Sequence, residues 1–172
     1  MLSRALRLLV LVAATGLSGA GAGPAWAQDD ELEAMATALK DTTFTLQDGL
    51  KVGEREGQPI SAQFEIDDGK LRVSIYTTKG DDFSEVVADP KSGAIVKTEK
   101  ITDTDELNDA ADQKAAMAKA KTSLVAAADA AVKENSGFRA VSVFPDLRDG
   151  HAIAEVTLLQ GTTAKKVTEK LE

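Results

Sequence analysis

The feature that most constrains this chain is the stretch ISAQFEID at residues 60–67, in which apolar and polar residues alternate without a break. Successive side chains of a β-strand point to opposite sides, so the apolar residues from Ile60 to Ile66 share one face of an extended chain. The stretch therefore predicts a strand with one buried and one wet face. Asp68-Gly69 follows directly and is typical of the two-residue turn of a β-hairpin.

Further strands extend this hairpin into an antiparallel meander. Alternation and β-branched residues predict strands at 71–76, 83–88 and 94–98, with turns at 79–81 and 89–93. The second turn raises the question of a site, because it carries Asp89, Lys91 and Ser92. Asp89 has no neighbouring base, no third group to orient it and no evident pocket, so we interpret the stretch as a turn and not as a catalytic site.

The residue types in this turn each have a conformational role. Proline presets φ near −65°, which suits Pro90 at a turn position, and an aspartate before it can accept a hydrogen bond from the backbone two residues on. Gly93 supplies a positive φ where the chain re-enters a strand. The turn is thus explained by backbone geometry alone.

Two helices are expected before the first strand. Residues 28–42 form a short amphipathic helix, and a second helix begins at Thr45, where Thr45 and Asp48 match the capping pattern. Gly49 and Gly53 lie on the inner face of this second helix. Each glycine costs about 1 kcal/mol relative to alanine, so a close approach to the sheet is expected to compensate.

The second half of the chain opens with a long alanine-rich segment. Residues 103–135 are helical in character and fit either one long helix or two helices broken near Lys121-Thr122. The β pattern resumes after Gly137. The last segment, 163–171, fits a strand or a helix, and we favour a terminal strand.

Both halves show the same order of helix, glycine, strand, Asp-Gly turn and strand. The corresponding glycines are Gly57, Gly69 and Gly80 in one half and Gly137, Gly150 and Gly161 in the other. The predicted fold class is therefore α+β, with two tandem helix-plus-antiparallel-meander repeats linked by a long alanine-rich helix. A unit of about 60 residues is marginally stable alone, so the two repeats are expected to share one core.

The first repeat resembles a PepSY domain, a small module of secreted peptidase propeptides and of many exported bacterial proteins. The resemblance covers residues 43–98 and rests on the helix, the alternating strand, the Asp68-Gly69 hairpin and the closing pattern of Val87, Asp89 and Gly93. Residues 121–172 resemble a second, degenerate copy without the closing turn. The resemblance implies a helix packed on an antiparallel sheet and a role in restraining peptidases, and it brings no catalytic residues with it.

The N-terminal residues have the features of a secretory signal peptide. Arg4 and Arg7 are followed by the apolar run from Leu8 to Ala14, and Ala25-Trp26-Ala27 forms a small-x-small cleavage site. The expected organisation is a signal peptide at 1–27, an amphipathic helix at 28–42, a PepSY-like repeat at 43–101, a helical linker at 102–120 and a degenerate repeat at 121–172. The mature protein is expected to be periplasmic or secreted.

Composition excludes several classes of function. The whole chain has a formal charge of −8, and loss of the two leader arginines makes it −10. Nucleic acids and anionic membranes are poor partners for such a chain, because both select basic patches. The chain has no cysteine, so disulfides and thiolate metal sites are excluded. The only tryptophan, Trp26, leaves with the leader, which excludes sugar platforms built on indole rings.

Two places in the sequence carry residue types that could bind a metal ion. His151 is the only histidine, and a zinc site would need an otherwise carboxylate ligand set, which is uncommon, so we expect an exposed turn residue. Five acidic residues suggest a calcium site, namely Asp103, Asp105, Glu106, Asp109 and Asp112. The EF-hand template fails there, because Leu107 and Asn108 occupy positions that need an oxygen ligand and a glycine.

Paired aspartates remain as possible catalytic groups. Asp67-Asp68 and Asp81-Asp82 both stand where turns are expected, and a glycosidase pair would need a groove and a defined separation. We therefore predict no catalytic, cofactor or metal site. The predicted function is a non-enzymatic exported module that binds another exported or envelope protein, a peptidase by family resemblance. The alternatives are an acidic small-ligand or cation-binding periplasmic protein and, third, a hydrolase with paired aspartates.

Overall fold

The computed structural model describes residues 25–172, with side chains from residue 30 onward. Most of the predicted signal peptide, residues 1–24, lies outside the described residues. The helices are α1 (Ala25–Leu39), α2 (Leu46–Gly53), α3 (Thr104–Lys119) and α4 (Leu124–Glu134). The strands are β1 (Gln58–Asp67), β2 (Lys70–Lys79), β3 (Asp82–Ala88), β4 (Ile95–Lys100), β5 (Arg139–Arg148), β6 (His151–Gln160) and β7 (Thr163–Lys170).

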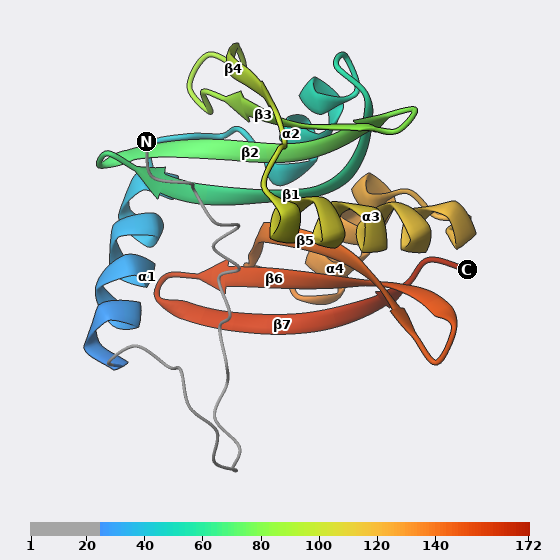
Figure 1. The fold of residues 1–172 in the computed structure, drawn as a ribbon. Coiled ribbons are helices and arrows are strands. Elements are labelled where there is room, and N and C mark those ends of the chain that lie inside the picture. Colours follow the sequence, from blue (N-terminus) through green and yellow to red (C-terminus); the bar gives the residue numbers. More distant parts are fainter. Residues whose placement is uncertain (1–24) are drawn as a thin grey trace.

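All seven strands form one antiparallel sheet in the order β4-β3-β2-β1-β5-β6-β7 (Figure 1). β1 pairs with β5, with Ala62 opposite Val143 and Gln63 opposite Ser142, so strands from the two halves of the chain are neighbours in the middle of the sheet. The predicted fold class of two helix-plus-meander repeats joined by a long helix is therefore wrong. The strands themselves were predicted at nearly the right residues, and the pairing across the halves was not.

The alanine-rich segment forms two helices and not one. α3 ends at Lys119, and a new helix starts after Ser123, whose Oγ accepts a hydrogen bond from the backbone N–H of Ala126 at 3.2 Å. α3 lies in front of the sheet in the view of Figure 1, and α4 lies behind it with α2. The segment thus crosses from one face of the sheet to the other, which a single long helix could not do.

A β-bulge moves Ile60 to the face of the sheet that α3 covers. In β1, Pro59 lies opposite Thr77 and Ser61 opposite Tyr76, so Ile60 is the extra residue of the bulge. Ile60 is fully buried with Tyr76 and with Ala110 of α3, in a cluster separate from the main core. The prediction that it shares a face with Ala62 and Phe64 is wrong for this reason.

The polar face of β1 is also partly buried, although the sequence predicts that this face is exposed to solvent. Ser61 is buried beneath α3 and its Oγ donates a hydrogen bond to Oε1 of Gln113, which is buried too, at 2.7 Å. Burying a hydroxyl or an amide costs free energy unless it is hydrogen-bonded, and this pair satisfies both groups. α3 can therefore cover a polar strip of the sheet.

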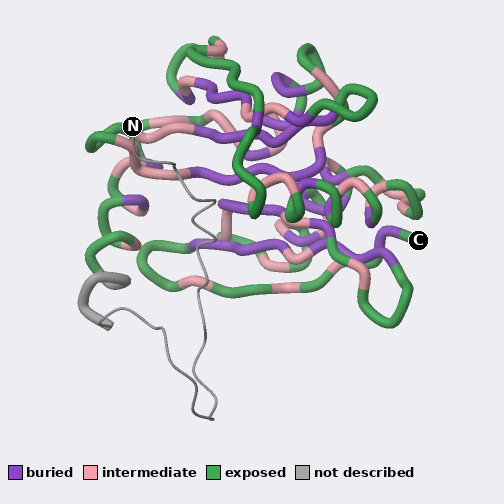
Figure 2. Tube along the Cα trace, in the orientation of Figure 1, coloured by how far each residue is buried: buried purple, intermediate pink, exposed green. Residues whose placement is uncertain are grey.

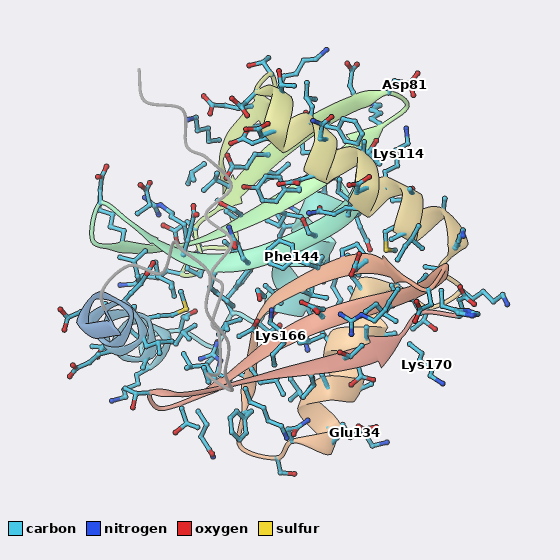
Figure 3. All side chains as sticks on the ribbon, turned by 60° about the horizontal axis from the view of Figure 1, so that its bottom comes forward. Asp81, Lys114, Glu134, Phe144, Lys166 and Lys170 are labelled. Carbon is cyan, nitrogen blue, oxygen red and sulfur yellow. The ribbon has the colours of Figure 1, made fainter. Side chains whose placement is uncertain are left out.

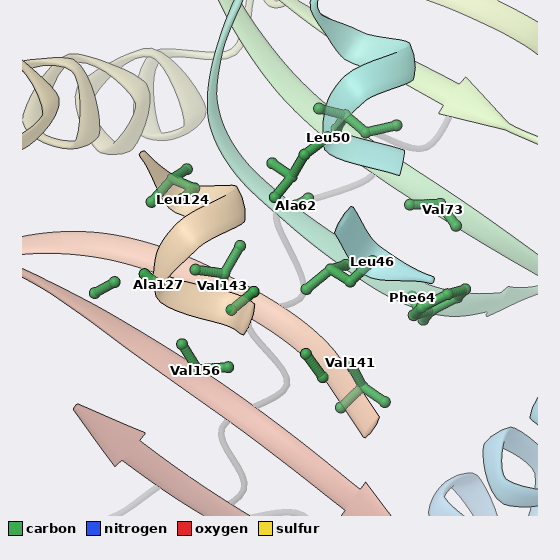
Figure 4. Close-up of a cluster of buried hydrophobic side chains, with 14 of the residues drawn as sticks. Leu46, Leu50, Ala62, Phe64, Val73, Leu124, Ala127, Val141, Val143 and Val156 are labelled. Carbon is green, nitrogen blue, oxygen red and sulfur yellow. The ribbon is translucent and has the colours of Figure 1, made fainter. Parts of the chain in front are cut away.

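The main core lies between the sheet and helices α2 and α4 (Figure 4). α2 approaches the sheet closely, since a Cβ atom added at Gly53 would lie 2.5 Å from Cγ2 of Ile75, and one at Gly49 would lie 2.7 Å from Cγ1 of Val73. These distances are too short for a side chain. The predicted compensation for the two helical glycines, close packing on the sheet, is thereby confirmed.

The edges of the sheet are exposed while its central strands are buried (Figure 2). β7 confirms the predicted terminal strand and forms one edge with three lysines, and β4 forms the other. Charged side chains on edge strands discourage pairing with other chains. Among the described residues, no helix is both long enough and apolar enough to span a membrane.

Candidate functional site

The β3–β4 turn, residues 89–93, has the geometry that its sequence predicts. Oδ1 of Asp89 accepts hydrogen bonds from the backbone N–H groups of Lys91 (2.7 Å) and Ser92 (3.2 Å). The N–H of Gly93 donates to the carbonyl oxygen of Asp89 at 2.8 Å, and Gly93 has a φ of +68°. The interpretation of these polar residues as turn formers is confirmed.

The turn packs against residues 40–44, which connect α1 to α2. Oγ1 of Thr42 donates to the carbonyl oxygen of Pro90 at 2.6 Å and accepts from the N–H of Phe44 at 3.0 Å. A Cβ atom added at Gly93 would lie 3.4 Å from the Phe44 ring, so the ring lies close against the turn. Two segments almost 50 residues apart in sequence thus form one connected surface.

Three adjoining hollows lie around this turn, so the prediction of no evident pocket is wrong. The middle hollow, of about 680 Å³, lies between residues 40–44 and 90–93. A second, of about 400 Å³, lies beside the start of β2 and shares Asp41, Thr42, Pro90 and Lys91 with the first. A third, of about 360 Å³, runs along α2 and shares Phe44, Asp48, Ser92 and Gly93 with the first. We call the residues that line these hollows the turn surface.

Basic side chains without partners gather on the turn surface. The ones that line it and make no hydrogen bond or ion pair are Lys40, Lys51, Arg55, Lys70 and Lys91. Of these, Lys51 is attracted by the nearby Asp48 carboxylate. Among the described residues, the other lysines and arginines without such a partner are Lys79, Lys121, Lys133 and Lys170. The remaining basic side chains are engaged, as Lys100 is with Asp82 and Arg148 with Glu155.

The acidic side chains of the turn surface are mostly held by the protein itself. Asp48 closes the capping box of α2, where its Oδ2 accepts from the N–H and the hydroxyl of Thr45. Oδ2 of Asp89 accepts from Nη1 of Arg72 at 3.2 Å. Backbone N–H groups, those of Thr45 and Lys91 respectively, are the main reason that the pKa of each carboxyl lies below its ordinary value. Both aspartates therefore serve local structure as anions.

A half-buried arginine, Arg139, supports the turn surface from the side of the sheet. Nη1 of Arg139 donates to the carbonyl oxygens of Leu39 (2.6 Å) and Thr42 (3.1 Å), and Nη2 donates to that of Phe44 (2.8 Å). Arg139 stands at the start of β5, so this guanidinium ties the α1–α2 connection to the sheet. Burial lowers its pKa from the ordinary value, and an arginine remains charged in proteins all the same.

The sequence-predicted candidates do not converge. His151 is exposed, as expected, and its Nδ1 lies 3.0 Å from Oε2 of Glu172 at the far end of the chain. Asp67-Asp68 and Asp81-Asp82 flank opposite ends of β2, and Asp68 adopts the positive φ of a hairpin turn. They therefore form no common carboxylate pair.

The remaining acidic candidates have structural contacts. Asp81 lies beside Lys114 of α3, which donates to it at 3.3 Å and stands over the Phe83 ring (Figure 3). Asp103 caps α3 by accepting from the N–H groups of Asp105 and Glu106. Within the described part of the chain, no group of three or more His, Cys, Asp or Glu side chains is placed to hold a metal ion.

Replacing Asp89 with asparagine is expected to change how stability responds to acid. The folded pKa of Asp89 lies below its ordinary value, so its charged form stabilises the fold above pH of about 4, and that contribution is lost as the pH falls through the folded pKa. Asp89→Asn keeps an acceptor for the turn and removes the charge opposite Arg72. At pH 7 we expect a loss of about 1 kcal/mol in the free energy of unfolding.

The measurement is urea unfolding of both proteins between pH 7 and pH 3. The gap between wild type and Asp89→Asn should shrink on the acid side. A gap that stays constant down to pH 3 would show that the charge of Asp89 contributes nothing and that the variant acts only through the shape of the turn.

Comparisons with known proteins give little further guidance. No family model matches the sequence, and no curated protein matches it. One solved structure, described as a "putative lipoprotein (CD1622) from Clostridium difficile 630", has 15% sequence identity and a TM-score of 0.45, with 78% of this chain and 92% of that chain covered. A likeness this distant says nothing about function. The resemblance to the PepSY family stays a prediction.

Proposed function

We propose that this chain is an exported, non-catalytic protein-binding module that binds another exported or envelope protein through the turn surface. One observation carries the proposal: basic side chains without partners line three adjoining hollows around a turn whose own polar groups are satisfied. A frame held by internal hydrogen bonds loses little freedom on binding, which favours affinity.

The groups on this surface suit binding better than bond breaking. Ser92 carries a hydroxyl in the turn, and its Oγ accepts from the N–H of Ala94 at 3.3 Å. Among the described residues, no hydrogen bond links this hydroxyl to a base. A nucleophile needs a base within hydrogen-bond reach and a third group to orient that base. Asp89, whose Oδ1 accepts from the N–H of Ser92, is already occupied by the turn and by Arg72.

Two parts of the proposal rest on sequence patterns. Export rests on the predicted leader at residues 1–27, and a peptidase as the partner rests on the PepSY resemblance at residues 43–98. Binding at the turn surface depends on neither pattern. The experiment below therefore tests the surface first and the identity of the partner second.

The absence of cysteine allows a site-specific test. A photo-crosslinker attached to a single cysteine at position 92 (Ser92→Cys) reports contacts at the turn surface. The matched control is Thr162→Cys in the β6–β7 turn, which lies near the opposite edge of the sheet because β4 and β7 are its two end strands. Both positions are exposed and uncharged.

Irradiation in the envelope fraction of the source cells should give a discrete crosslinked product from position 92, and excess unlabelled protein should abolish it. Position 162 should give none. Equal crosslinking from both positions, or none from position 92, would contradict binding through this surface. Mass spectrometry of the product then shows whether the partner is a peptidase.

A further inference from the structure

We infer that the turn surface binds an acidic peptide segment of the partner, an inference that rests on the proposed function. The surface differs in charge from the rest of the molecule. It is lined by six basic side chains, the five that make no hydrogen bond or ion pair and Arg72, against three acidic ones, Asp41, Asp48 and Asp89. The chain as a whole carries a formal charge of −8.

This contrast makes the surface selective for negative ligands. An acidic segment is repelled by most of an acidic protein and attracted where unpaired cations gather, so it is steered to that place. Lysines already paired with carboxylates would have to exchange one partner for another. Lys40, Lys70 and Lys91 have no such partner to give up.

The arrangement of the cations favours an extended ligand over a compact anion. They come from separate elements: Lys40 follows α1, Lys51 lies on α2, Lys70 begins β2 and Lys91 lies in the turn. They are distributed over the three hollows and not gathered in one. Carboxylates spaced along a peptide can reach several of these hollows at once.

The turn also lacks what a phosphate site uses. Phosphates are bound by backbone N–H groups that point at the ligand. In the turn, the N–H groups of Lys91 and Ser92 already donate to the Asp89 side chain, and that of Gly93 donates to the Asp89 carbonyl oxygen. Within this turn, only side chains are left to receive the ligand. The half-buried Phe44 ring adds an apolar contact between two hollows.

Fluorescence anisotropy with protein purified after export tests the inference. The probe is a short labelled peptide with glutamate at alternate positions, and the matched probe has glutamine in their place. The variant is Lys40→Ser with Lys70→Ser and Lys91→Ser. The control is Lys79→Ser with Lys121→Ser and Lys133→Ser, which removes the same charge from exposed lysines whose side chains make no hydrogen bond or ion pair and lie outside the three hollows. Thermal unfolding verifies that both variants are folded.

The glutamate peptide should bind and the glutamine peptide should not. The turn-surface variant should lose about tenfold in affinity and the control variant less than twofold, as removal of three exposed charge interactions implies. Raising the salt from about 0.05 M to about 0.5 M should weaken binding, because exposed charges are screened. Inorganic phosphate at millimolar concentration should not displace the peptide.

Several outcomes would overturn the inference. Equal losses in the two variants would mean that only net charge matters, and displacement by millimolar phosphate would point to a compact anion site. If neither peptide binds while position 92 still crosslinks to a partner, the acidic class is wrong and the proposed function stands. If position 92 does not crosslink but the glutamate peptide binds and the turn-surface variant weakens that binding, the site for acidic peptides is supported. The proposed protein partner is then contradicted.

Discussion

Replacing Leu171 with alanine is expected to lower the free energy of unfolding by about 3 kcal/mol, as loss of a fully buried leucine side chain usually does. Leu171 has 0% exposure and belongs to the main core. Its carbonyl oxygen accepts from the N–H groups of Lys121 (2.6 Å) and Thr122 (2.9 Å), and its N–H donates to Ala152 at 3.0 Å. Leu171 therefore holds the α3–α4 connection against β6.

Urea unfolding measures this effect, and a change in midpoint without a change in slope identifies a loss of stability alone. Leu147→Ala is the matched control, because it makes the same change at the partly exposed end of β5 and should cost about 1 kcal/mol. Equal losses from the two variants would contradict the role of Leu171 as an anchor of the core.

The strands could be predicted because their signals are local. Alternation at residues 60–67 and the Asp68-Gly69 turn depend only on neighbours in sequence, and both occur in the structure. The pairing of β1 with β5 has no local signal, since Ala62 and Val143 lie about 80 residues apart. The separate repeats were inferred from matching local patterns, which say nothing about which strands become neighbours.

The misplacement of Ile60 has a similar origin. As an apolar residue, Ile60 fits the alternating pattern of the sequence. The extra residue becomes visible only in the pairing with β2, where the consecutive residues Thr77 and Tyr76 lie opposite Pro59 and Ser61. The break between α3 and α4 did leave a local signal. Ser123 stands before an apolar run, where an N-cap residue is expected.

In the candidate site, too, the local features could be predicted from the sequence and the long-range ones could not. The role of Asp89 in the turn could be predicted because its Oδ1 accepts only from the backbone of residues 91 and 92. Its ion pair with Arg72 had no such local signal. The hollows could not be predicted, because Lys40, Lys70 and Lys91 follow different elements and only the folded chain places them on one surface. A lysine in or beside a turn is too common a pattern to single out in a sequence.

Arg139→Met is expected to lower the free energy of unfolding by about 3 kcal/mol and to weaken binding at the turn surface. The guanidinium donates three hydrogen bonds to backbone carbonyls of the α1–α2 connection, and each bond from a charged group contributes about 2 kcal/mol with incomplete additivity. Methionine keeps much of the apolar length of the side chain, so the loss reports the hydrogen bonds. Urea unfolding gives the stability change.

Arg139→Lys separates geometry from charge. Lysine keeps the charge but cannot donate in the planar fork that reaches Leu39, Thr42 and Phe44 together, so its stability should lie between those of wild type and Arg139→Met. Residues 40–44 form one wall of the middle hollow. Crosslinking from position 92, measured well below the unfolding temperature of each variant, should therefore fall in the same order. If the stability falls and the crosslinking stays unchanged, the partner does not contact residues 40–44. The binding surface would then consist of residues 89–93 and α2 alone.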